Sequence, residues 1–215
     1  MNFKFAILAL ALIASVADAK SRKIVEPLDP SIVAAHQITG VEVVVSPTAT
    51  ESFAKLEAIA VQKRSDAKLP VIEAATPVDP AAPRPAADQY STLPFARMLP
   101  LVIEDVTREW GLAAGRAVKL KVTVDTLKMA NAGMAMLFGS SDQLAGMVEV
   151  FDASDGAALG SFYIDVVNSH GGLAGLAMRG SGVRESLSEE FALETSRVLT
   201  GRKSKTPKAP KAVRS

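Results

Sequence analysis

A glycine-rich stretch, NSHGGLAGLAMRGSG at residues 168–182, joins a strand-like run to a helix-like run, where phosphate-binding loops are found. A Walker-type loop needs a lysine and a hydroxyl after its last glycine to neutralise phosphate and hold magnesium, and this stretch supplies neither. The dinucleotide pattern G-x-G-x-x-G also fails, because Glu185 stands where the third glycine is required. We therefore predict no nucleotide cofactor. Arg179 and Arg184 are a candidate anion-binding pair, because helix amino ends attract anions.

Other catalytic chemistry has little support. Asp165, Ser169 and His170 have the composition of a hydrolase triad, but adjacent side chains in an extended segment point to opposite sides. The two histidines of the chain, His36 and His170, are too far apart in sequence to share a metal from one helical turn, and cysteine is absent. We predict a protein that is not an enzyme and that holds no metal or cofactor.

A second loop, MANAGMAMLFGSS at residues 129–141, is also rich in glycine, alanine and methionine. Loops that face water do not normally carry so many large apolar side chains. These side chains either fold back and complete the core or form an adaptable apolar surface for a partner, a second copy or a membrane. We predict the contact surface, with these members: Met134, Met136, Leu137, Phe138, Leu173, Leu176 and Met178.

Four strands are expected around these loops. Residues 117–126, AVKLKVTVDT, alternate between apolar and polar, which predicts a strand with one dry face. The consecutive valines of residues 38–46 suggest a strand buried on both faces. Strands at 144–152 and 157–168 flank DASDG, which we interpret as a hairpin turn, because the ligand spacing of a calcium loop stops too soon.

Three helices are expected between and after these strands. Thr48 and Glu51 match a capping box before a helix over residues 49–63. A second helix within residues 91–111 contains Pro100, which should kink or restart it. The third runs over residues 183–200 and ends at a glycine. The order β-α-α-β-β-β-α predicts a single α/β (α+β) domain, with a four-stranded mixed sheet and helices packed on one face.

This topology brings the two apolar loops together. If the last three strands form an up-down-up meander, the loops after the first and the third of them leave the sheet at the same end. The DASDG hairpin then lies at the opposite end. The turn at Pro47 would join the two loops if the first strand runs parallel to the second through its helical crossover.

The segments outside this core have distinct compositions. Residues 1–19 resemble a secretory signal: Lys4 precedes an apolar run over residues 5–16, and Ala17-Asp18-Ala19 fits the small-x-small cleavage pattern. The run is shorter than the roughly 20 residues that span a bilayer. We predict cleavage after Ala19 and a periplasmic protein, peripheral to a membrane if it contacts one. Residues 20–37 are predicted to be an exposed arm, and residues 66–89 an Ala/Pro-rich insertion in the domain 38–200.

Residues 201–215 form a basic tail. Its charges have no acidic neighbour and are Arg202, Lys203, Lys205, Lys208, Lys211 and Arg214. Subtracting these six charges from the net charge of +1 leaves −5 for the rest of the chain. The interleaved proline and alanine predict a disordered segment that either seeks anionic surfaces or only aids solubility. Nucleic acid is not an expected partner, since an exported chain with few aromatic residues lacks stacking groups.

The run LFGSSDQLAGMVEVFDASDGAALGSFYIDVVNSHGG resembles the later half of small bacterial envelope families, often lipoproteins, whose function is unknown. These families are similar in fold to the amino-terminal domain of TolB. The resemblance implies an envelope role without established chemistry. The chain lacks the lipid-accepting cysteine of a lipoprotein.

The sequence thus favours an exported, non-catalytic envelope protein that contacts a membrane or protein partner through its apolar loops and basic tail. Self-association through the same loops is part of this hypothesis. The alternative is a periplasmic protein that binds a small molecule or an anion at Arg179 and Arg184.

Overall fold

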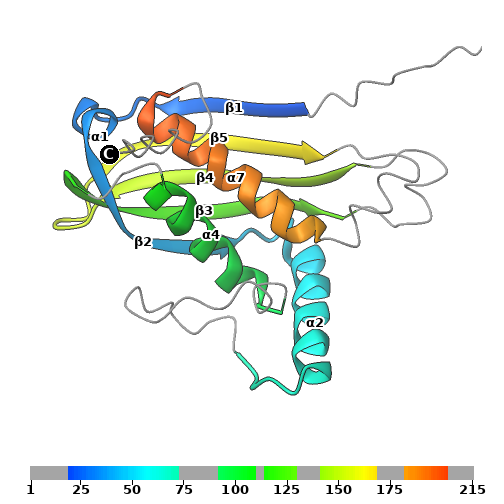
Figure 1. Ribbon diagram of the computed structural model, residues 1–215. Coiled ribbons are helices and arrows are strands. Elements are labelled where there is room, and N and C mark those ends of the chain that lie inside the picture. The colour runs from blue at the N-terminus through cyan, green and yellow to red at the C-terminus, as the bar shows by residue number, and fades with distance from the viewer. Residues whose placement is uncertain (1–18, 73–91, 110–113, 130–140, 169–181, 203–215) are drawn as a thin grey trace, which may run out of the picture.

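The computed structural model describes residues 19–72, 92–109, 114–129, 141–168 and 182–202. They form one mixed sheet with helices packed against it (Figure 1). The strands are β1 (Ala19–Glu26), β2 (His36–Val45), β3 (Arg116–Lys128), β4 (Asp142–Asp152) and β5 (Ala158–Asn168), in the spatial order β1-β5-β4-β3-β2. β2 runs parallel to β3, and the other neighbours are antiparallel. The prediction of a mixed sheet is confirmed, but the sheet has five strands rather than four.

The fifth strand, β1, comes from the segment predicted to be an exposed arm. It pairs with β5 at the edge of the sheet and is interrupted by a bulge between Ile24 and Glu26. Its basic side chains do not prevent pairing, because an edge strand leaves them in water or within reach of a partner. Arg22, for example, lies 3.5 Å from a carboxylate oxygen of Glu194, which is itself buried.

Alternation along the central strands separates an inner face from an outer face. On β3, four apolar side chains are buried on the inner face: Val118, Leu120, Val122 and Val124. Lys119, Lys121 and Thr123 lie on the outer face between them. The predicted period of two is confirmed.

The prediction that the first valine-rich strand is buried on both faces is wrong. β2 lies at the edge of the sheet, and Val43, Val44 and Val45 are only partly buried. A run of β-branched residues favours a strand wherever the strand packs, so composition alone did not distinguish an edge from a centre.

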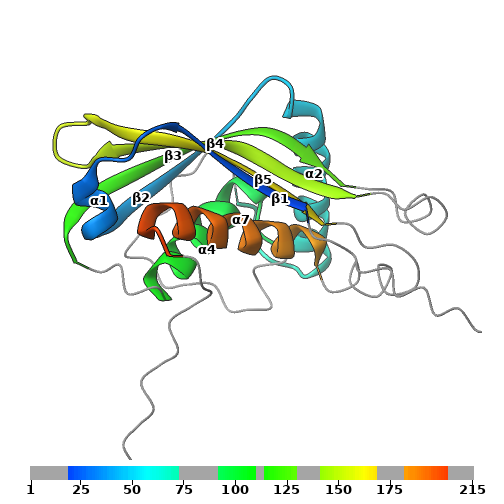
Figure 2. The same ribbon diagram turned by 90° about the horizontal axis from the view of Figure 1, so that it is seen from above.

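The helices are α1 (Pro30–Ala34), α2 (Thr50–Asp66), α4 (Phe95–Glu109) and α7 (Val183–Thr200). α4 and α7 cover the inner face of the sheet (Figure 2), and α4 is assigned as one helix with Pro100 inside it. α2 stands at one end of the sheet, where Phe53 meets Phe95 of α4 edge to face, with 5.8 Å between ring centroids. In the described part of the chain, α4 and α7 thus pack on one face as predicted, while α2 lies to the side.

The predicted capping box is not formed. Ala49 is the N-cap of α2 and makes no side-chain capping bond. Thr48 Oγ1 instead donates to the carbonyl of Asp125 at 2.9 Å, and Glu51 pairs with Lys55 at 2.7 Å. A long-range bond between the turn and β3 has replaced the local one.

The sheet has two ends, which we name by what lies there. At the loop end, β3 and β5 finish and β4 begins, as the pairs Lys128–Gln143 and Asp142–Asn168 establish. Ala19 pairs with Val167 at this same end. At the hairpin end, Asp152 and Ala158 are joined by the DASDG turn, where Gly156 has a positive φ of 74°. The predicted meander and hairpin are confirmed.

α7 connects the two ends. Near its start, Asn168 Nδ2 contacts Ser186 Oγ at 3.5 Å, at the loop end of β5. At its finish, Gly201 lies against Val33 of α1, which belongs to the hairpin end (Figure 1). The residues after α7 therefore leave the domain at the end opposite to the loops.

Arg64 links residues near the two ends of the Ala/Pro-rich insertion. It is buried, and it donates from Nε to the carbonyl of Pro70 at 2.8 Å and from Nη1 to Thr92 Oγ1 at 3.1 Å. Most of the predicted insertion lies outside the described residues. The Arg64 guanidinium thus links Pro70, near the start of the predicted insertion, to Thr92 just after it.

Candidate functional site

The predicted contact surface lies outside the described residues. This applies to all seven apolar candidates, Met134, Met136, Leu137, Phe138, Leu173, Leu176 and Met178, and also to Arg179. The strands that flank the two loops are described, and they converge at the loop end. The prediction that both loops leave the sheet at one end is therefore confirmed, whereas the role of their side chains stays a prediction.

The turn after β2 also lies at the loop end. Ser46 N–H donates to the carbonyl of Val124 at 3.0 Å, and Thr48 is bonded to Asp125 as described above. Because β2 runs parallel to β3, the turn at Pro47 is brought beside the end of β3, as expected. Three chain connections thus start from one end of the sheet.

Arg184, the described member of the anion-binding pair, is buried at the start of α7. Its Nη1 donates to the carbonyl of Leu93 at 2.8 Å, and its Nη2 lies 3.3 Å from Glu185 Oε1. Burial raises the pKa of the nearby Glu57 carboxyl, an effect that bonds from backbone N–H groups and the charge of Arg184 oppose. Arg184 therefore ties α7 to the segment before α4, and an anion would have to share its guanidinium with these partners.

Of the three residues with the composition of a hydrolase triad, only Asp165 is described. Gln143 Nε2 donates to Asp165 Oδ1 at 2.9 Å, while Ser169 and His170 lie outside the described residues. Across the described ranges, no group of three His, Cys, Asp or Glu side chains could hold a metal ion. Among the same residues, no helix is both long and apolar enough to cross a membrane.

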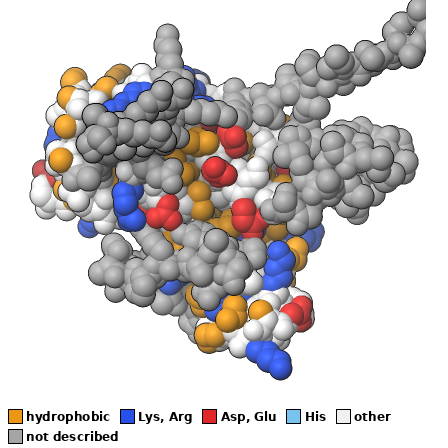
Figure 3. All heavy atoms as spheres, viewed as in Figure 1, with side chains coloured by type: hydrophobic (Ala, Val, Ile, Leu, Met, Phe, Trp, Pro, Cys, Tyr) orange, Lys and Arg blue, Asp and Glu red, His pale blue; other side chains and the backbone are white. Residues whose placement is uncertain are grey.

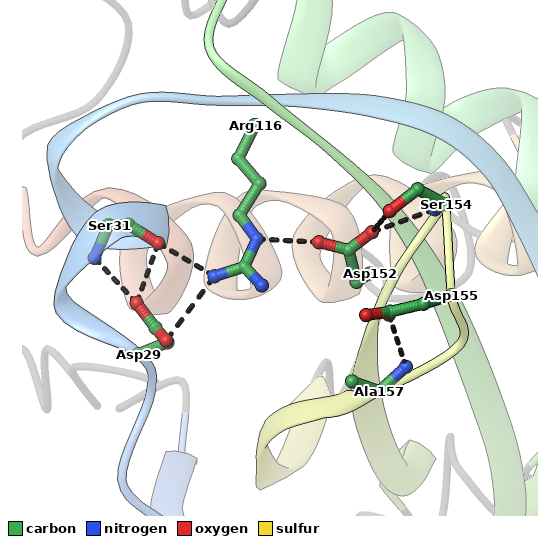
Figure 4. Close-up of polar contacts among 7 residues, drawn as sticks. All are labelled: Asp29, Ser31, Arg116, Asp152, Ser154, Asp155 and Ala157. Carbon is green, nitrogen blue, oxygen red and sulfur yellow. Dashed lines mark hydrogen bonds and ion pairs between the residues drawn. The ribbon is translucent and has the colours of Figure 1, made fainter.

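A polar cluster at the hairpin end was not predicted from the sequence (Figure 4). Arg116 lies between two carboxylates, with Nε 2.6 Å from Asp152 Oδ2 and Nη1 3.3 Å from Asp29 Oδ2. Its Nη1 also donates to Ser31 Oγ at 3.0 Å, and Ser31 in turn donates to Asp29. The cluster connects α1, β3 and the β4–β5 hairpin.

Hydrogen bonding determines the charge states of this cluster. Bonds from the side chain and backbone of Ser154, followed by the bond from Arg116, hold the pKa of Asp152 far below its usual range. Bonds from Ser31 lower the pKa of Asp29, and Asp152 raises the pKa of Arg116. Each charge has a partner, so the cluster is suited to fastening the hairpin end and not to proton transfer.

The helix-covered face carries acidic side chains over α7 and α4 (Figure 3). Lys and Arg side chains are also visible on this face, so its charge is mixed.

The outer face of the sheet carries a shallow groove of about 430 Å³ near the hairpin end. It crosses β2, β3 and β4, and its lining residues are Gly40, Val41, Glu42, Lys119, Leu120, Lys121, Phe151, Asp152, Ala153 and Gly156. The alternation of β3 could have indicated Lys119 and Lys121 as outer-face residues. The contribution of Gly40 could not be foreseen, because it depends on the register between β2 and β3.

Comparison with known proteins does not assign the chain to a family. No protein-family profile matches the sequence, and no curated protein matches it. Among solved structures, the PelC dodecamer from Paraburkholderia phytofirmans is 12% identical with a TM-score of 0.29, covering 86% of this chain and 100% of that one. Protein XCC0632 from Xanthomonas campestris is 14% identical with a TM-score of 0.38, covering 78% and 85%.

Lipoprotein GNA1162 from Neisseria meningitidis is 18% identical to this chain with a TM-score of 0.26, covering 72% of this chain and 98% of that one. These identities and TM-scores are too low to assign a family or an activity. The similarity to the amino-terminal domain of TolB is not shown by these matches and stays a prediction.

Proposed function

We propose that this chain is an exported, non-catalytic envelope protein that contacts a membrane or a protein partner through the loop end of its sheet. The observation that carries the proposal is the strand register. Lys128, Asp142 and Asn168 lie at one end of the sheet, so the two stretches richest in glycine and methionine both start from this end. Large apolar side chains gathered at one end of a domain are typical of a contact surface.

The position of the amino terminus supports the same assignment. Ala19, the last residue of the predicted signal, is paired at the loop end, and the chain therefore enters the domain there. The hairpin end, by contrast, is fastened by its own polar cluster. The basic tail begins at that other end and supplies a second, electrostatic contact.

Flotation of the chain beginning at Lys20 with vesicles of anionic phospholipid tests the proposal. We expect the unaltered chain to float in moderate salt and a Phe138→Asp, Leu176→Asp variant to stay in the dense fraction. Each large apolar side chain contributes about 1.5–3 kcal/mol when fully buried, so two charges placed there should abolish a reversible contact.

The matched control replaces two apolar side chains that are exposed elsewhere. Ile59 on α2 and Val71 after it are 51% and 78% exposed, so Ile59→Asp, Val71→Asp adds the same charge at positions outside the sequences of the two loops. We expect this variant to float like the parent. Equal flotation of the parent and the Phe138, Leu176 variant would reject the membrane contact, and failure of the parent to float would direct the search to protein partners.

A further inference from the structure

The groove on the outer face of the sheet has the chemistry of a binding site. One row of paired residues forms its floor: Gly40 on β2 pairs with Lys119 on β3, which pairs with Phe151 on β4. A cation is thus flanked by an aromatic ring on one side and by a residue without a side chain on the other. Among the described elements, α4 and α7 lie on the opposite face and leave this one open (Figure 2).

Lys119 is the cation of this groove that is available to a ligand. Arg116 is engaged by Asp29 and Asp152, and Lys121 lies 3.7 Å from Glu149. Lys119 is exposed, and within the described ranges its side chain has neither an ion pair nor a hydrogen bond. An anion in the groove would therefore gain an interaction without breaking one.

Gly40 makes the space that a ligand would occupy. A Cβ placed on Gly40 would have no heavy atom within 4 Å, so the volume above it is empty. The register of the strand pairing shifts between Ile38 and Gly40, and this bulge places Gly40 directly opposite Lys119. Phe151, partly buried on the far side, offers an apolar wall.

Two further features define the ligand. Glu42 is exposed one row away, opposite Lys121, so a negative group is favoured at the Lys119 end and disfavoured at the other. The wall formed by Asp152, Ala153 and Gly156 is held in place by the bonds of Asp152 to Ser154 and Arg116. Such a preformed wall lowers the ordering cost of binding.

We propose that this groove binds a small anion with one phosphate or carboxylate group attached to an apolar ring or short chain. The charged group lies against Lys119, and the apolar part fills the space above Gly40, on the side of Lys119 away from Phe151. A volume of about 430 Å³ lies within the range of small-molecule sites. The site is separate from the loop end and from Arg184, so its test does not depend on the proposed function being correct.

Titration of the full chain beginning at Lys20 with phenyl phosphate, followed by amide NMR spectra, tests the site. We expect saturable shifts of the Gly40, Lys119 and Gly156 amides with a Kd of about 1 mM, as one ion pair and one apolar contact allow. Phenol, which has the ring without the charge, should bind at least about tenfold more weakly to the same unaltered protein. No saturable shift at these amides, or equal binding of phenol, would overturn the proposal.

Two variants locate the binding. Gly40 has no positive φ and no atom within 4 Å of an added Cβ, so the fold accepts a side chain there. Gly40→Val should fill the groove and abolish the phenyl phosphate shifts of the Lys119 and Gly156 amides. Lys119→Gln should weaken binding at least about fivefold, whereas the control Lys23→Gln, on the edge strand β1 outside the groove, should not. Unchanged affinity in Lys119→Gln would place the anion elsewhere and refute the assignment.

The same chemistry occurs in free metabolites and in lipid headgroups, and vesicles separate these sources. If phosphatidic acid vesicles compete with phenyl phosphate for the Gly40 and Lys119 amides, the natural anion is a headgroup. If they leave the phenyl phosphate shifts unchanged, the anion is a soluble molecule. Both results retain the site and identify its source.

Discussion

Replacing Arg184 by methionine would separate a structural role from an anion-binding role. Arg184 is buried, with 7% of its side chain exposed, and it bonds to the carbonyl of Leu93 and to Glu185. Methionine keeps the length of the aliphatic stem but leaves that carbonyl and the neighbouring carboxylates, Glu185 and Glu57, without the guanidinium. We expect this loss to act on stability first.

The magnitude follows from burial. Removing one partner of a buried ion pair costs about 3–5 kcal/mol when the other charge stays buried. Glu185 is 27% exposed and regains water, so we expect Arg184→Met to lower the free energy of unfolding by about 2–4 kcal/mol. For a domain of this size that corresponds to a fall in Tm of about 4–16 °C.

Urea unfolding followed by circular dichroism measures this change. The control is Arg108→Met on α4: Arg108 is 61% exposed and pairs only with Asp105, at 3.6 Å, among the ion pairs of the described residues, so stability should change by less than about 0.5 kcal/mol. Sulfate added to the parent tests the other role. If Arg184→Met were as stable as the parent and lost a stabilisation by sulfate that the parent shows, our structural interpretation would be refuted and the anion-binding alternative supported.

Two acid-dependent effects should occur in separate pH ranges. The folded-state pKa of Asp152 is depressed by its bonds, so its stabilising contribution is present above the ordinary value of 3.8 and is lost as pH falls below it. Asp152→Asn should make the free energy of unfolding less dependent on pH in that range. The same fall in stability at acid pH as in the parent would contradict this. Burial lowers the pKa of His36, so stability should fall as pH drops below 6.5. His36 Nδ1 donates to the Ile32 carbonyl at 2.7 Å, and its buried Nε2 has no partner in the described structure, so a second proton would be unsatisfied. His36→Leu should remove the pH dependence that begins below 6.5, as denaturation at several pH values would show; a persisting slope would count against it.

Periodicity was sufficient to predict most of the fold. The alternation of β3 and the turn DASDG fixed the meander, and the last helix was predicted over the same residues, 183–200, that α7 occupies. These signals are local, because they depend on which side chains face one core. The positions of the two apolar loops followed from the same reasoning.

Features that depend on distant neighbours were not predictable. β1 has no apolar alternation, and Arg22 is stabilised by Glu194, more than 170 residues later. Thr48 bonds to β3 instead of capping its own helix, and the space above Gly40 exists only through the register of β2 with β3. Each of these depends on a contact that no stretch of sequence contains by itself.

The opposite positions of the loop end and the tail limit what one flat surface can contact. β3 has 13 residues, so at about 3.3 Å per residue the two ends of the sheet are about 40 Å apart. Residues 202–215, if extended as polyproline II at about 3.1 Å per residue, would reach about 43 Å, so only their last residues would pass the loop end. Charges attract a surface only within a Debye length of about 8 Å, so the first basic residues of the tail cannot assist a surface held at the loop end. The apolar contact and the basic contact that we propose therefore start from opposite ends of the domain, and only the last residues of an extended tail would reach a surface held at the loop end.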